Sequence, residues 1–150
     1  MSRRLCAAIA SVAAVAVGVS GCGSGSMSAA ELRTAAQRAC TDAARRLSQI
    51  PAPRTPSAAE AFLRRGVSAM EPEMIALDRL SPTPALAAPY QRARTATGGE
   101  LDALRSSVNG LKAGNDPAVA IKTLQQELLP LERRARAAWH TVGVPACADS

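Results

Sequence analysis

The stretch DPAVAIKTLQQELLPLERRARAAWHTVG, residues 116–143, has the clearest periodicity in this sequence of 150 residues. Its apolar positions recur at intervals of three and four, which places them on one face of an α-helix. They are Ile121, Leu124, Leu128, Leu131, Ala135, Ala138 and Val142. Asp116 and Pro117 form a typical helix start, and Gly143 a typical end. We expect one amphipathic helix here, kinked at Pro130 because proline removes a backbone hydrogen bond.

Two capping boxes predict where the first two helices begin. In Ser28–Glu31 and again in Ser57–Glu60, a serine can accept from a free N–H while a glutamate reaches back to the serine backbone. The first helix should end before Pro51, and the second should extend to Leu80 with a kink at Pro72 or a division near Ala69. The expected buried face of the second helix consists of Phe62, Gly66, Met70, Met74, Leu77 and Leu80.

A third helix is predicted from Pro84, with Thr83 as its N-cap, to Leu111. Gly98 and Gly99 lie midway and allow a bend, because glycine weakens a helix. Four helices joined by short proline-rich turns predict an all-α fold, an antiparallel up-down four-helix bundle with kinked helices. The segment after Gly143 should return along the bundle as a tail.

The first 22 residues have the three parts of an export signal. Arg3 and Arg4 supply positive charge, an apolar stretch of residues 7–19 follows, and small residues precede Cys22. A membrane-spanning helix needs about 20 apolar residues, so this stretch is too short to be a good anchor by itself. We therefore expect residues 1–21 to be removed as a signal peptide.

The four residues Val19-Ser20-Gly21-Cys22 resemble the lipobox of bacterial lipoproteins. The resemblance implies that the Cys22 thiol receives a diacylglyceryl group and that a peptidase cuts before it. Two or more acyl chains hold a protein firmly on a membrane. Residues 22–27 would then form a lipidated flexible tether, and residues 28–150 the bundle domain. An ordinary secretory signal cut near Gly21 or Gly25 is the alternative.

The positions of the four cysteines predict different roles for them. Cys6 leaves with the signal and Cys22 carries lipid, so Cys40 and Cys147 remain in the mature domain. In an oxidising exported compartment such a pair is expected to form a disulfide, which would tie the tail to the first helix. In the chain-entropy model, closing so long a loop contributes about 4–5 kcal/mol at most. Two free thiols or a metal-binding pair are the alternatives.

Composition argues against several function classes. The chain carries 18 basic and 12 acidic residues and three aromatic side chains, which is mildly basic and too poor in aromatics for a nucleic-acid surface. His140 is the single histidine, and no HExxH, Gly-x-Ser-x-Gly or phosphate-loop motif occurs. Glu71 and Glu73 point in different directions on a helix and should belong to a solvated face. We expect no catalysis, no metal and no cofactor.

The sequence offers two candidate binding surfaces. Arginines fall in groups that, if they converge, can bind anionic lipid or a phosphate-bearing polymer, because guanidinium binds phosphate bidentately. These groups are Arg45 with Arg46, Arg64 with Arg65, Arg92 with Arg94, and Arg133 with Arg134 and Arg136. Alternatively, apolar side chains can line a pocket between helices. The candidate lining residues are Phe62, Met70, Met74, Tyr90 and Trp139.

Together, the lipobox, Cys40, the turn at residues 80–84 and the closing Gly143–Cys147 segment resemble small helical lipoproteins of high-GC actinobacteria. The resemblance implies a helical protein anchored by lipid on the outer face of the cell membrane, and it implies no particular activity. We therefore expect a non-enzymatic interaction or accessory protein that is attached to the membrane through Cys22. Its expected binding partner is an envelope protein or an anionic lipid or polymer. A carrier of a small apolar ligand is the alternative.

Overall fold

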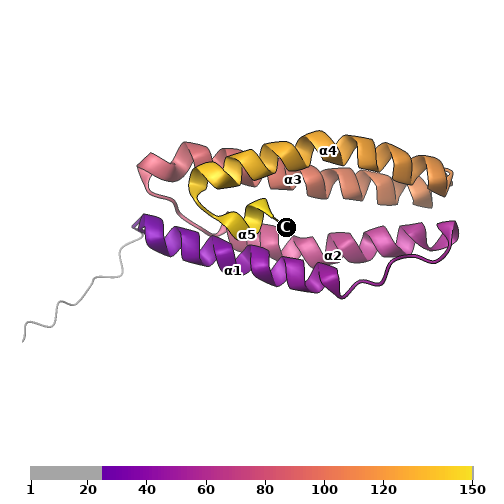
Figure 1. The fold of residues 1–150 in the computed structure, drawn as a ribbon, viewed down its shortest axis with the longest axis horizontal. Helices are drawn as coiled ribbons and strands as arrows, with labels where there is room; N and C mark the ends of the chain where they lie inside the picture. Colours follow the sequence, from indigo (N-terminus) through magenta and orange to yellow (C-terminus); the bar gives the residue numbers. More distant parts are fainter. Residues whose placement is uncertain (1–24, 150) are drawn as a thin grey trace, which may run out of the picture.

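The computed structural model describes residues 25–149, and within that range all regular structure is helical. In chain order the elements are α1 (Ala29–Ser48), the short 3-10 helix η1 (Pro56–Ala58), α2 (Ala59–Asp78), α3 (Pro84–Lys112), α4 (Pro117–Val142) and α5 (Pro145–Ala148). The four long helices lie side by side and alternate in direction (Figure 1). The prediction of an antiparallel helical bundle is confirmed. The predictions for residues 1–21 and for Cys22 lie outside the described range.

Local side-chain chemistry sets three of the helix ends as expected. At the start of α1, the Glu31 N–H donates to Ser28 Oγ over 3.3 Å, and the Ser28 N–H donates to Glu31 Oε2 over 2.8 Å. Asp116 accepts from the Val119 N–H over 2.9 Å at the start of α4. Gly143 ends α4 with a φ of 82°, a left-handed conformation that favours glycine.

The second predicted capping box is wrong. A 3-10 turn precedes α2, whose N-cap is Ala58 and has no side-chain hydrogen bond. The Ser57 hydroxyl lies 3.0 Å from the Thr55 hydroxyl, and Glu60 forms an ion pair with Arg64 over 3.2 Å. Both capping side chains are therefore engaged elsewhere.

The helices α2, α3 and α4 are each continuous through the proline or glycine residues inside them. Pro72 lies inside α2 and Pro130 inside α4, and α2 is not divided near Ala69. In α3, a Cβ added to Gly99 would lie 3.3 Å from Leu131 Cδ2 on α4. Gly99 therefore permits the close approach of α3 and α4, and the glycine pair does not end the helix.

The largest buried cluster forms around Trp139, whose side chain is fully buried. Its indole N–H donates to Thr97 Oγ1 over 2.9 Å, which satisfies the one polar atom of the ring. The Tyr90 ring meets Trp139 edge to face at a centroid distance of 5.8 Å, and the Tyr90 hydroxyl donates to the Leu77 carbonyl over 2.6 Å. These contacts connect α4, α3 and α2.

A smaller cluster of Leu63, Val108 and Leu124 holds the other half of the bundle together. It corrects the predicted face of α2, because Leu63 is buried where Phe62 was expected and Phe62 is only partly buried. The inward face of α2 is set by packing against both α1 and α3, which a single helical stripe does not specify.

The expected tail forms the short helix α5, which lies between α1 and α4 (Figure 1). The Cys40–Cys147 disulfide joins it to α1, with a Cα–Cα distance of 5.1 Å. On the other side, Arg136 Nε donates to the Ala148 carbonyl over 3.1 Å. Arg33 Nε on α1 donates to the Val142 carbonyl at the end of α4 over 2.8 Å. The predicted disulfide is confirmed, and α5 closes the bundle between its first and last long helices.

Replacing both Cys40 and Cys147 by alanine should lower the free energy of unfolding by about 3–4 kcal/mol, because the bond closes a loop with a sequence separation of 107. Urea denaturation followed by fluorescence of Trp139 measures the difference. A reductant should destabilise the wild type similarly and leave the double variant unchanged. Equal stability of the oxidised wild type and the variant would contradict a bracing role.

Thr97→Val should lower the free energy of unfolding by about 1–3 kcal/mol, because it leaves the buried Trp139 N–H without its acceptor. Thr34→Val on α1 is the matched control, since Thr34 is exposed. Thermal unfolding of the three proteins checks the prediction, and a Thr97 variant as stable as the Thr34 variant would refute it.

Candidate functional site

The described chain begins at one end of the bundle, beside the start of α3. The Met27 N–H donates to the Ser81 carbonyl over 2.7 Å, and the Met27 side chain packs against the main buried cluster. The predicted lipidation site lies five residues before Met27 in the sequence. The start of the described chain is therefore held at the end of the bundle where α3 begins and α4 ends.

None of the helices formed by residues 25–149 has the length and apolarity required to cross a membrane.

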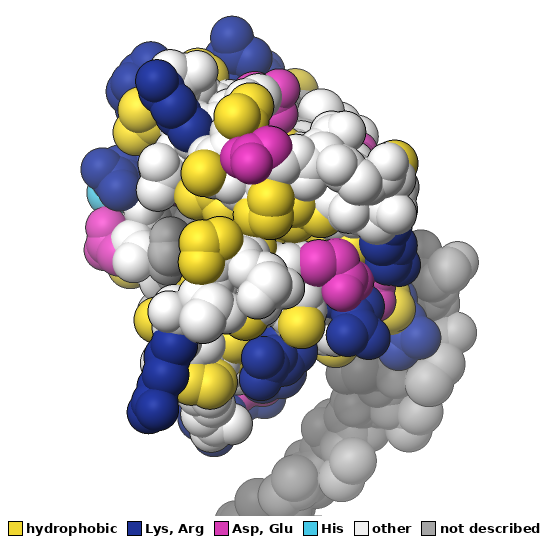
Figure 2. Space-filling model, turned by 90° about the vertical axis from the view of Figure 1, so that its right-hand side faces the viewer, with side chains coloured by type: hydrophobic (Ala, Val, Ile, Leu, Met, Phe, Trp, Pro, Cys, Tyr) yellow, Lys and Arg dark blue, Asp and Glu magenta, His cyan; other side chains and the backbone are white. Residues whose placement is uncertain are grey.

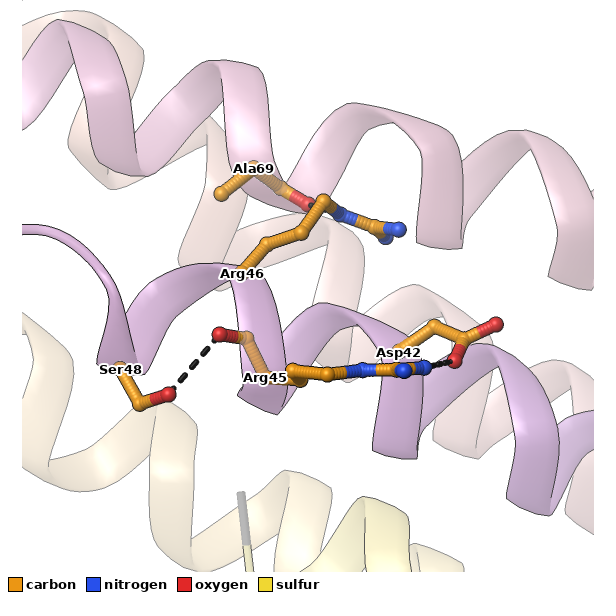
Figure 3. Close-up of polar contacts among 5 residues, drawn as sticks. All are labelled: Asp42, Arg45, Arg46, Ser48 and Ala69. Atoms are coloured by element: carbon orange, nitrogen blue, oxygen red, sulfur yellow. Dashed lines mark hydrogen bonds and ion pairs between the residues drawn. The ribbon is translucent and has the colours of Figure 1, made fainter.

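Most of the paired arginines support the fold. Arg45 forms an ion pair with Asp42 on α1, whereas Arg46 extends to α2 and donates from Nε to the Ala69 carbonyl over 3.0 Å (Figure 3). The adjacent arginines thus have different roles, one within its own helix and one between helices.

Further arginines are similarly engaged. Arg64 pairs with Glu60, Arg94 pairs with Asp78, and Arg136 binds the end of α5. Arg65 donates to the Ala61 carbonyl over 3.2 Å. At the end of the bundle remote from the described start of the chain, basic side chains are scattered among apolar and acidic ones (Figure 2). The arginine groups do not converge on this face.

Three arginines of the predicted groups form no ion pair or side-chain hydrogen bond within the part of the chain that the structure describes. They are Arg92, Arg133 and Arg134, and all three are exposed. Two of them, Arg92 on α3 and Arg134 on α4, border the same open groove. Two arginines that the fold itself does not use therefore lie at the border of one groove.

The groove runs between α3 and α4 and has a volume of about 780 Å³. Partly buried small and apolar residues form its floor, and exposed polar residues border it. The lining residues are Gln91, Arg92, Thr95, Ala96, Gly99, Leu131, Arg134, Ala137, Ala138 and Thr141. A cavity of this size with a mainly apolar lining and few polar groups is typical of ligand sites.

The five predicted pocket residues lie in different surroundings. Tyr90 and Trp139 belong to the main cluster, and Met70 is 8% exposed. Phe62 packs on the smaller cluster, at the other half of the bundle. Met74 borders a separate hollow near Arg105, and none of the five lines the α3–α4 groove. Sequence reasoning missed the groove because the helical pattern assigns Leu131 and Ala138 to the buried stripe of α4, whereas Ala96 and Gly99 on α3 are too small to produce an apolar stripe.

The prediction that Glu71 and Glu73 belong to a solvated face is wrong for Glu73. The helix does separate Glu71 from Glu73, and Glu71 pairs with Arg105 on α3 over 3.0 Å. Glu73, however, is only 5% exposed rather than part of a solvated face. Its spacing provided a clue, because Met70, Glu73 and Leu77 follow one another at intervals of three and four on one helical face.

Burial raises the pKa of Glu73 to about 7, although the Arg46 charge opposes the shift. The pKa of Glu100 on α3 is also raised to about 7, first by burial and then by repulsion from Glu132 and Glu73. Carboxylates from three helices, α2, α3 and α4, therefore interact electrostatically around Glu100. Within residues 25–149 no group of three or more histidine, cysteine, aspartate or glutamate side chains is arranged to hold a metal ion.

The raised pKa makes stability depend on pH. The Glu73 carboxyl ionises near pH 4.5 in the unfolded chain and near 7 in the folded protein, so the folded state binds more protons between these values. Stability should therefore fall as pH rises from about 4.5 to 7, and remain lower above 7.

Glu73→Gln should raise the free energy of unfolding by about 1–3 kcal/mol at pH 8 and change it little at pH 4, because glutamine carries no charge to bury. Urea denaturation at both pH values measures this difference. Glu127→Gln is the control, since Glu127 is exposed on α4 and its replacement should have little effect at either pH. A Glu73 variant with the same stability change at both pH values would contradict the prediction.

His140 lies exposed in the last turn of α4. No carboxylate among residues 25–149 lies within ion-pair distance of its ring. Its position suits a cation near the negative end of a helix dipole. The arrangement provides no acid–base pair around this ring within the described chain.

No family model matches this chain, and no curated protein or solved structure shows significant similarity to it.

Proposed function

We propose that this protein is a lipid-anchored interaction or accessory protein on the extracytoplasmic face of the bacterial cell membrane, and that it acts by binding rather than by catalysis. The observation that carries the proposal is the Cys40–Cys147 disulfide. Disulfides form and persist in oxidising, exported compartments and are rare in the cytosol. The bond supports export, and it leaves Cys22 as the one cysteine of the mature chain available for lipid.

The sequence before the bundle supports the anchor. The lipobox-like residues 19–22 lie directly before a short glycine- and serine-rich segment, whose composition is typical of a flexible spacer. Lipid on Cys22 would hold a bundle that has no membrane-spanning helix among residues 25–149. Residues 1–21 would be the removed signal peptide.

A carrier of an apolar ligand is the second candidate function, and the α3–α4 groove favours it. The site of such a carrier would differ from the pocket predicted around Met70 and Met74, because those side chains do not line the groove. Both functions depend on a binding surface displayed at the membrane.

Cys22→Ala should abolish incorporation of an alkyne-tagged fatty acid by cells that produce the protein, because no acceptor thiol remains at the lipobox. Cys6→Ala is the matched control and should be labelled like the wild type, since Cys6 lies in the expected signal peptide. Gel fluorescence after coupling of the alkyne to a dye measures incorporation. Undiminished labelling of the Cys22 variant, or an unlabelled wild type, would refute the anchor.

A further inference from the structure

We propose that the α3–α4 groove binds a long-chain fatty acid drawn from the membrane, with the acyl chain over the groove floor and the carboxylate between Arg92 and Arg134. The supply of this ligand rests on the proposed membrane anchor. The groove itself is argued from its shape, its lining and its charges.

The floor of the groove suits an acyl chain. Ala96 and Gly99 on α3 face Leu131 and Ala138 on α4, and all four are partly buried. Their small side chains, apart from Leu131, leave a furrow between two closely packed helices. The lining spans residues 91–99 and 131–141, which corresponds to a length of about 12–15 Å along the helices. An acyl chain can lie along this furrow, and part of a long chain would extend beyond it.

The charges at the border suit an acid head group. Arg92 and Arg134 come from different helices and form no ion pair within residues 25–149. Their neighbours two residues onward are used by the fold, since Arg94 pairs with Asp78 and Arg136 binds the Ala148 carbonyl. Guanidinium groups bind carboxylates through paired charge-assisted hydrogen bonds. An apolar furrow bordered by two uncompensated cations is complementary to an anionic amphiphile.

The position of the groove supports a membrane source for the ligand. It lies in the half of the bundle where α3 begins and α4 ends. Met27 is bound to Ser81 just before α3, so the described chain starts at this same end (Figure 1). A lipid on Cys22 would therefore keep the groove close to the bilayer surface, where fatty acids partition.

The test uses the full mature protein, purified from membranes and reconstituted in phosphatidylcholine vesicles. A diazirine derivative of palmitic acid is added and photolysed, and the labelled peptides are identified by mass spectrometry. We expect adducts in residues 91–99 and 131–141, and we expect unlabelled palmitic acid to compete for them.

Two tryptophan variants locate the site. Ala137→Trp should fill the groove and lower labelling about tenfold, whereas Ala118→Trp on the same helix should not. Both alanines are exposed, so neither change disturbs the core, and thermal unfolding verifies that both variants are folded. Equal labelling in the two variants would overturn the proposal.

The head group is tested with Arg92→Gln and Arg134→Gln combined. This variant should lose at least about tenfold in palmitic acid labelling, because charge-assisted hydrogen bonds are removed. The corresponding diazirine fatty alcohol should label the wild type only weakly. Equal capture of acid and alcohol would overturn the assignment of an anionic ligand. Chemical crosslinking of the same protein tests the remaining occupant, since crosslinks between groove residues of two copies would assign the groove to self-association and overturn the proposal.

Failure of this proposal is distinguishable from failure of the anchor. Photolabelling reports only the groove, and incorporation of the alkyne-tagged fatty acid at Cys22 reports only the anchor. A lipidated protein without groove adducts would reject the ligand site alone. An unlipidated protein with groove adducts would reject the anchor alone.

Discussion

The disulfide between Cys40 and Cys147 is the constraint on which the closed form of this bundle depends. The core is rich in alanine, so each helix buries little apolar area, and hydrophobic stabilisation is roughly proportional to that area. The bond fixes α5 against α1, while Arg136 holds the other side of α5 to α4. One short helix thus completes the packing between the first and last long helices.

Around this closure, the polar groups of the core are mostly satisfied by single contacts between helices. Trp139 binds Thr97, and Tyr90 binds the Leu77 carbonyl. Glu73 is different, because it is buried with a pKa raised to about 7 and has Arg46 as its opposing charge. A buried carboxylate of this kind lowers stability at neutral pH. The bundle therefore combines a well-packed aromatic centre with a buried carboxylate that destabilises the fold as the pH rises toward neutral.

The arginines on the surface divide into those that stabilise the fold and those that are available to a ligand. Arginines near acidic partners or helix ends are engaged in the fold, as Arg94 and Arg136 are. Arg92 and Arg134 lie beside these residues in the sequence but border a groove with an apolar floor. In the proposed function, the lipid anchor would hold that groove at the membrane, so that one location serves attachment and ligand capture together.

The sequence alone determined the helical class, the four long helices, the cap at Ser28 and the stop at Gly143, because periodicity and capping depend on residues only a few positions apart. It also predicted the pairing of Cys40 with Cys147, because the number and positions of the cysteines left only these two in the domain. Sequence reasoning misplaced the start of α2 and the environment of Glu73, since both depend on which neighbours compete for a side chain. Only the tertiary structure decided the groove between α3 and α4. Its floor and its two free arginines come from distant segments, and small residues such as Gly99 acquire meaning only when another helix packs against them.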